Sequence, residues 1–217
     1  MAGFIAVILS GAALLHLPIA TTGVDYSFGD RLFTATSAGT VTGLQVVDTA
    51  SGWTHFGQVV IMVLAQIGGF GLMAVSSVVA VALAGRLELR HRLATQAEVN
   101  LDGAANFRSV ILGVFKWSMG VEATVAAALF IGFAGIHGEP VGRAAWLGLF
   151  HAVTSFNNAG FALFSDNLVG FVDDPWISGV IATSIALGGI GFPVLMELRR
   201  QYHFPKRWSL HTKITLL

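Results

Sequence analysis

The sequence predicts an all-α integral membrane protein. Its 217 residues are 54% hydrophobic and only 11% charged, whereas a soluble domain carries about 25% charged residues. Hydropathy favours four membrane-spanning helices, at residues 1–20, 59–84, 110–136 and 176–196. A shorter apolar stretch in each half of the chain predicts a re-entrant pore loop, which enters the membrane and returns to the same side.

The first span carries no charged residue, and no basic residue precedes Arg31. A spanning helix that closes near Pro18 is therefore favoured over a signal peptide. The second span contains a cluster of glycines, and the fourth span repeats it. Small residues favour close helix packing, with a bend beneath a pore as the alternative. The two clusters are Gly68, Gly69 and Gly71, and Gly188, Gly189 and Gly191.

Residues 32–44 (LFTATSAGTVTGL) form the first predicted pore loop. As a helix these 13 residues would cross only about half of the ~30 Å hydrocarbon core. Non-helical backbone is tolerated at that depth only inside protein or beside a water-filled cavity. The stretch predicts a short helix followed by a carbonyl-lined cation filter, an ordinary extracellular loop being the alternative. The filter residues would be Thr40, Val41, Thr42 and Gly43.

A second copy of this stretch lies 117 residues further along. FTATSAGTVTGL at 33–44 aligns with FHAVTSFNNAGF at 150–161, and IGGFG at 67–71 answers LGGIG at 187–191. The chain is therefore predicted to hold two helix–pore-loop–helix repeats, 1–85 and 109–200. A cytoplasmic linker, 86–108, joins them, and 201–217 is a cytoplasmic segment with the start of a third repeat. The second set of filter residues would be Asn157, Asn158, Ala159 and Gly160.

The distribution of Lys and Arg between the two sides of the membrane favours a re-entrant loop at residues 144–165 over a spanning helix. Re-entry leaves only Arg31 and Arg143 outside and keeps both termini cytoplasmic, in agreement with the positive-inside rule. The predicted inner residues are Arg86, Arg90, Arg92, Arg108, Arg199, Arg200, Lys206, Arg207 and Lys213. The outer aspartates would either raise the local cation concentration or form an ordinary solvated surface. They are Asp25, Asp30, Asp48, Asp166, Asp173 and Asp174.

Glu122 lies deep in the third predicted span. A carboxylate at mid-bilayer must face protein and be paired or protonated. Two interpretations stay open, a structural tie to a pore-loop amide or hydroxyl and a role in ion passage. The alternative function is an ion-coupled secondary carrier with a midplane site, in which Glu122 would be the coupling carboxylate.

Other function classes are disfavoured. The chain has no cysteine, its seven histidines have no ligand spacing, and no nucleophile–base pair is visible. We therefore expect no zinc site and no enzyme activity. Net charge is zero, and basic runs interleaved with aromatic residues are absent from the sequence, so no nucleic-acid partner is expected.

Four segments resemble the Trk/Ktr/HKT superfamily of potassium transporters, most closely the membrane subunit of the Ktr type. They are TATSAGTVTGLQVVDT, HAVTSFNNAGFALFSDNL, FGQVVIMVLAQIGGFG and SLHTKITL. The resemblance implies potassium uptake across the inner (plasma) membrane through four repeats around one pore. This chain would hold the first two repeats, half of that pore, and is expected to be part of a longer transporter.

The same resemblance implies the ion and the partners. Gly43 and Gly160 match the filter glycines of the first two repeats, and glycine at position 43 is typical of potassium-selective members. The bound ion would be potassium. The expected partners are the remaining two repeats, a second copy in a homodimer, a cytoplasmic nucleotide-binding regulatory ring and the lipid bilayer.

Overall fold

The computed structural model describes residues 2–93, 103–205 and 208–216, in which helices are joined by turns and irregular segments and no β-strand is present. Residues 94–102 of the predicted linker and Lys206 and Arg207 of the basic segment lie outside the described residues. Contacts divide the chain into two units, Met1–Gly69 with Met119–Gly189, and Phe70–Ser118 with Ile190–Leu217. These contact units combine parts of both repeats predicted from the sequence, 1–85 and 109–200. The division into repeats stays a prediction.

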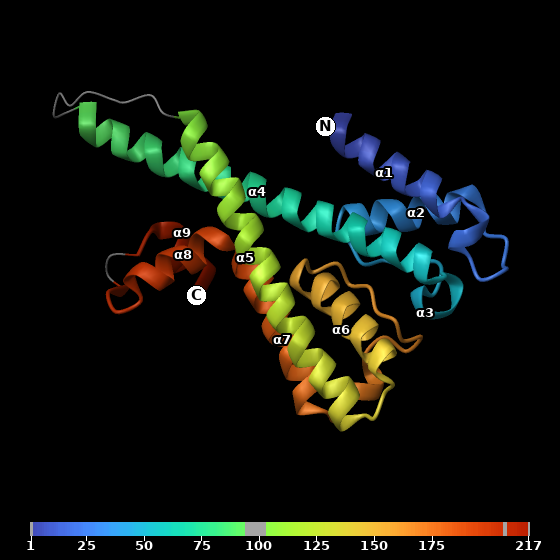
Figure 1. Cartoon of the computed structure of the whole chain (residues 1–217). Helices are drawn as coiled ribbons and strands as arrows, with labels where there is room; N and C mark the ends of the chain where they lie inside the picture. Colours follow the sequence, from blue (N-terminus) through green and yellow to red (C-terminus); the bar gives the residue numbers. More distant parts are fainter. Residues whose placement is uncertain (1, 94–102, 206–207, 217) are drawn as a thin grey trace. The chain divides into compact units, whose positions relative to one another are not determined.

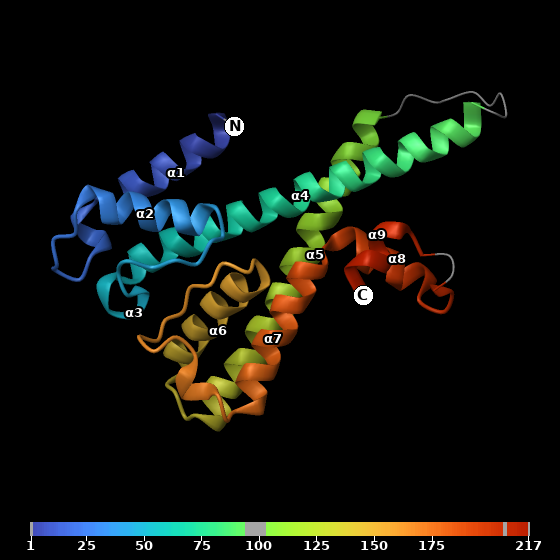
Figure 2. The same cartoon turned by 180° about the vertical axis from the view of Figure 1, so that it is seen from behind.

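The first half of the chain begins with two helices that lie side by side in both views (Figures 1 and 2). These are α1 (Ala2–Leu15) and α2 (Phe28–Gly39). A 3₁₀ turn, η1 (Pro18–Ala20), separates them. The short helix α3 (Thr49–Gly52) and the long helix α4 (His55–Leu93) follow.

Helix α1 ends five residues before the end of the span predicted at 1–20. Pro18 restricts the residue before it to extended backbone, and Leu17 has φ −65° and ψ 139°. Fourteen residues rise about 21 Å, less than the ~30 Å hydrocarbon core. The continuous helix is therefore shorter than the predicted span.

The elements of the second half are α5 (Gly103–Ile131), the π-helical turn η2 (Gly132–Ile136), α6 (Val141–Phe156), η3 (Val169–Phe171), α7 (Pro175–Ile190), α8 (Phe192–Gln201) and α9 (Leu210–Leu216). The second half again places a helix that leads to a predicted filter segment, α6, between two apolar helices, α5 and α7. The prediction of one continuous helix over 176–196 is wrong, because α7 ends at Ile190. Gly191 has φ +81°, which is not helical, and the next residues start α8 with a proline in its first turn.

Among the residues that the structure describes, two stretches are long and apolar enough to cross a membrane, His55–Ala74 and Ile111–Ile136. Two further apolar helices are shorter, Gly3–Leu15 and Pro175–Ile190. All four overlap predicted spans. The all-helical fold agrees with a membrane protein, while four complete crossings and the re-entry of two loops stay predictions.

Close packing through glycine holds the short helices in the first unit. A Cβ on Gly68 of α4 would lie 2.1 Å from the carbonyl oxygen of Gly39, the last residue of α2. A Cβ on Gly188 of α7 would lie 1.8 Å from the carbonyl oxygen of Phe156, the last residue of α6. The packing interpretation is confirmed at both positions, and α4 runs through Gly68 as one unbroken helix.

The second unit has its own contacts. The rings of Phe70 and Phe115 meet edge to face with centroids 5.8 Å apart. The Glu197 carboxylate accepts hydrogen bonds from the Ser209 backbone N–H and the Thr212 hydroxyl, each at 2.5 Å. This carboxylate therefore ties α8 to the start of α9.

Candidate ion-binding site

Helix α2 leads to the first predicted filter segment, residues 40–43. It begins at Phe28 because Ser27 and Asp30 form a capping box, in which each side chain accepts from the other's backbone N–H, at 3.2 and 3.0 Å. The prediction began this stretch at Leu32 and missed its first turn. The Ser-x-x-Asp pattern at 27–30 is the signal that marks this start.

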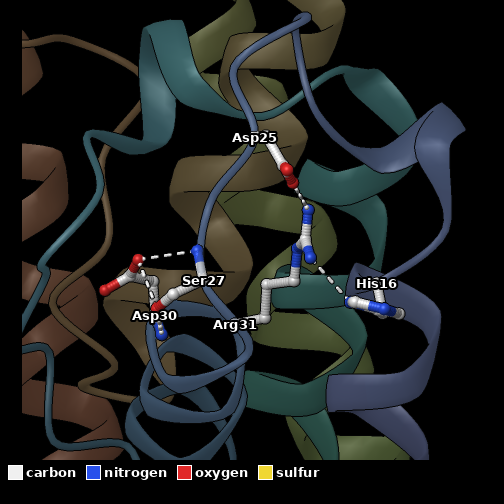
Figure 3. A network of polar contacts seen from close by, with 5 residues as sticks. All are labelled: His16, Asp25, Ser27, Asp30 and Arg31. Carbon is white, nitrogen blue, oxygen red and sulfur yellow. Dashed lines mark hydrogen bonds and ion pairs between the residues drawn. The ribbon is translucent and has the colours of Figure 1, made fainter.

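Arg31, in the first turn of α2, is charged and yet only 6% exposed. Its side chain extends between Asp25 and His16 (Figure 3). The Nη2 group donates to Asp25 Oδ1 at 3.2 Å, and Nη1 lies 2.6 Å from His16 Nδ1. Arginine has no acceptor, so Nη1 donates and His16 Nδ1 accepts. The network joins α2 to the end of α1, which sequence reasoning missed because it counted Arg31 only as an outer charge.

Both short helices end in the same backbone motif. After α2, the N–H groups of Val41 and Thr42 donate to the carbonyls of Ala38 and Ser37, at 3.1 and 2.9 Å. The bonds after α6 match them at 3.0 and 2.8 Å: Asn158 with Ser155, and Ala159 with Thr154. This pair of bonds is the Schellman motif, which turns the chain out of a helix. The predicted change from helix to non-helical backbone is present in both copies.

The motif requires a left-handed residue at its turn. Val41 and Asn158 occupy this position with φ +49° and +56°. Asparagine tolerates this region, whereas a β-branched valine there is a genuine outlier. Such a residue costs on the order of 1–3 kcal/mol and persists only where its surroundings enforce it. The first segment is therefore the more strained of the two.

Gly43 and Gly160 end the two predicted filter segments and touch each other. Their φ angles are +80° and +70°. A Cβ on Gly43 would lie 3.0 Å from the Gly160 Cα, and a Cβ on Gly160 would lie 2.9 Å from the Gly43 Cα. Both positions require glycine for two reasons, the positive φ and the approach of the other segment.

Asn157 opens the second segment with its side chain buried, at 3% exposure. Its Nδ2 group lies 3.1 Å from Oε1 of Glu122 on α5 and 3.2 Å from Oε1 of Gln66 on α4. The carbonyl oxygen of Val153 lies 2.9 Å from the same nitrogen. The predicted tie between Glu122 and a pore-loop amide is thus present, and the role of Glu122 in a pore stays a prediction.

Thr40, the counterpart of Asn157, is held differently. Its hydroxyl donates to the Thr36 carbonyl at 2.7 Å and lies 2.6 Å from the Thr42 hydroxyl, so its partners are local. At the other end of the second segment, Gln45 Nε2 donates to the Gly160 carbonyl oxygen at 3.3 Å. The first half of the chain therefore reaches both ends of residues 157–160, through Gln66 and Gln45.

Several outer aspartates have structural partners. Asp174 accepts from two backbone N–H groups at the start of α7, and its Oδ2 lies 2.6 Å from His137 Nε2. Asp48 accepts from the Ser51 hydroxyl at 2.5 Å and the Ser165 hydroxyl at 2.6 Å. Burial acts to raise the pKa of Asp48, but these donors and the backbone N–H groups of α3 outweigh it, so its pKa lies below the ordinary value. These carboxylates stabilise the loops in which they lie, and their outer position and any effect on cations stay predictions.

Comparison with known proteins decides the family. The profile of the family described as "TrkH: Cation transport protein" matches residues 2–214. This chain belongs to that family. Membership confirms the resemblance found in the sequence and agrees with a membrane protein of cation transport rather than an enzyme.

Individual TrkH relatives have the names of uptake proteins. The chain is 42% identical over 214 residues to the Ktr system potassium uptake protein B of Bacillus subtilis (strain 168). It is 37% identical over 223 residues to the protein of the same name from Vibrio alginolyticus. It is 35% identical over 216 residues to the potassium/sodium uptake protein NtpJ of Enterococcus hirae. Each match covers 99% of this chain and 47% of the relative, so the chain spans about half the length of the curated relatives it matches.

Proposed function

We propose that this chain forms half of a potassium-uptake pore, with residues 40–43 and 157–160 as two walls of its selectivity filter. The observation that carries the proposal is the contact between Gly43 and Gly160, which end segments of matching backbone geometry. The family description and the names of the relatives support the choice of potassium.

The chemistry of the proposed filter follows from its backbone. A potassium ion gives up its water only where other oxygens replace it, and carbonyl oxygens do so without a fixed charge that would trap the ion. The carbonyls would come from the two sets of filter residues, Thr40, Val41, Thr42 and Gly43, and Asn157, Asn158, Ala159 and Gly160. Potassium is then the transported ion rather than a cofactor.

The remaining walls would come from two further repeats of the same transporter. The relatives' extra length, about half of each protein, has room for them. By the same resemblance we propose a homodimer and a cytoplasmic nucleotide-binding ring as partners. In a tightly packed ring of four segments, the glycine ends would lie on one ion path.

The proposed topology places the chain in the plasma membrane with both termini cytoplasmic. The native chain has no cysteine, so single introduced cysteines report sidedness cleanly. Cysteines replacing Asp25, Glu139 and Asp173 should react with an impermeant reagent from outside, and those replacing Glu98 and Lys206 only from inside. External labelling at Lys206 would contradict the scheme.

The filter is tested by Gly43→Ser and Gly160→Ser in the assembled transporter. Each should lower the preference for potassium over sodium, because the added Cβ meets the facing glycine at 3.0 or 2.9 Å. The measurement is potassium uptake, with sodium as competitor, in a potassium-uptake-deficient bacterium. Gly138→Ser is the matched control, since Gly138 also has a positive φ, +68°, with open space around it. Unchanged ion preference in both filter variants, at normal membrane levels, would refute the assignment.

A further inference from the structure

We propose that Gln66, Asn157 and Glu122 form an amide clamp that fixes the second filter segment and thereby sets ion selectivity. Gln66 and Glu122 are then positioning residues, which act on the ion through Asn157. The inference rests on the proposed function, because it assigns the clamp to the filter described above.

The clamp holds the residue at which the backbone leaves the helix. Asn157 is the C-cap of α6, with φ −79° and ψ 0°, and the next residue is left-handed. Its side-chain amide carries two hydrogens and faces three acceptors, the oxygens of Glu122, Gln66 and Val153 at 2.9–3.2 Å. Fixing this side chain fixes the Cα from which residues 158–160 start.

Helix α4, from the other predicted repeat, contacts Asn157 through two residues one turn apart. It presents Gln66 as an acceptor, and three residues later it presents Gly69. A Cβ on Gly69 would lie 2.1 Å from Asn157 Oδ1 and 2.6 Å from Asn157 Cβ. One helix turn therefore supplies both a polar contact and the space that the asparagine side chain fills.

The first filter segment lacks this arrangement. The residue 117 positions before Glu122 is Ile5, which is 55% exposed, and the residue 120 positions after Gln66 is Ala186. Thr40 instead bonds within its own helix and segment. Helix packing alone therefore does not require the clamp, since the other repeat builds the same turn without it.

The two side-chain acceptors of the Asn157 amide predict how the variants behave. Glu122→Gln keeps an acceptor oxygen for this amide and should be tolerated. Glu122→Ala and Gln66→Leu each remove one side-chain hydrogen bond that positions the amide. The loss of such a buried hydrogen bond changes an equilibrium by about tenfold.

The experiment measures potassium-over-sodium preference in the assembled transporter at matched membrane levels. Glu122→Gln should stay within about twofold of the unmodified protein, and Glu122→Ala and Gln66→Leu should each lower the preference by about tenfold. Gln58→Leu is the matched control on the same helix. Gln58 is 7% exposed and bonds to the Trp146 ring N–H at 2.9 Å and to the Thr49 and Trp53 carbonyls. Its loss should lower thermal stability and leave ion preference unchanged.

The outcomes separate the clamp from the filter. If Gly43→Ser changes the ion preference while Gln66→Leu and Glu122→Ala do not, the clamp is wrong and the proposed function stands. Equal and complete loss of transport in Glu122→Gln and Glu122→Ala would also overturn the clamp, in favour of a charge role for Glu122. If neither Gly43→Ser nor Gly160→Ser changes the ion preference, the filter assignment falls together with the clamp.

Discussion

Gly68→Ala should separate α4 from the end of α2, and the structure gives the distance. The added Cβ would lie 2.1 Å from the Gly39 carbonyl oxygen and 2.8 Å from its carbonyl carbon. An ordinary contact begins at 3.4 Å, so the two helices must move apart by about 1.3 Å at this point. Both atoms are backbone, so no side-chain rotation can relieve the clash, and the shift falls on the residue before the first proposed filter segment.

The expected cost is that of overpacking, about 1–3 kcal/mol. For a chain of this length that corresponds to a fall of about 2–12 °C in melting temperature. Thermal unfolding of the purified protein in detergent measures the melting temperature. Potassium uptake in cells, with sodium as competitor, measures ion preference for the same variant. Gly71→Ala is the matched control three residues away in α4, because a Cβ there has no atom within 4 Å. It should stabilise the helix by up to about 1 kcal/mol.

The second repeat provides an independent copy of the experiment. Gly188→Ala brings a Cβ to 1.8 Å from the Phe156 carbonyl oxygen, whereas Gly179→Ala in the same helix meets open space. Gly188→Ala should therefore lower the melting temperature at least as much as Gly68→Ala. Equal melting temperatures for Gly68→Ala and Gly71→Ala, or for Gly188→Ala and Gly179→Ala, would refute the packing argument.

Two further changes probe the turn and the outer loops. Val41→Asn should raise the free energy of unfolding by about 1 kcal/mol, because it relieves a left-handed valine, and Asn158→Val should lower it by about the same amount. Opposite signs in thermal unfolding would contradict the strain argument. Ser165→Ala removes a donor that holds the pKa of Asp48 below its ordinary 3.8. A lowered folded pKa stabilises the protein above the unfolded value and the effect is lost as pH falls through the folded value. The deficit of Ser165→Ala should thus be present at pH 7 and shrink below about pH 4 in unfolding measurements; a deficit independent of pH would exclude this role for Asp48.

The local geometry of the candidate site was predictable because it is encoded in short-range patterns. An apolar stretch too short to span, followed by residues that suit neither helix nor strand, predicted the turn after Gly39. The sequence repeat at an offset of 117 residues then placed Asn158 at the position equivalent to Val41, and Gly160 at the position equivalent to Gly43. Small residues in an apolar helix predicted the close approach at Gly68.

The supports of the site were less predictable, because they depend on which helices meet. Nothing in the spacing of His16, Asp25 and Arg31 indicates that they form one network, since the contact exists only once α1 lies against α2. Glu122 could be assigned to a pore-loop amide as a class of partner. Its particular partner Asn157, shared with Gln66 of the other repeat, required the packed helices.

The two predicted repeats build the same turn with different supporting contacts, and this separates the geometry of the proposed filter from the contacts that stabilise it. Arg31 spans from α2 to the end of α1, whereas its counterpart 117 residues later is Gly148, where a Cβ would lie 2.9 Å from the α5 backbone at Ala126. One short helix is tied to its neighbour through a long side chain, and the other packs a glycine directly against its neighbour's backbone. An ion at the proposed site would meet only backbone oxygens, so its selection constrains the turn and the terminal glycine in both copies. The surrounding contacts are free to differ as long as they hold that turn, which is why substitutions of the supports should change selectivity differently in the two repeats.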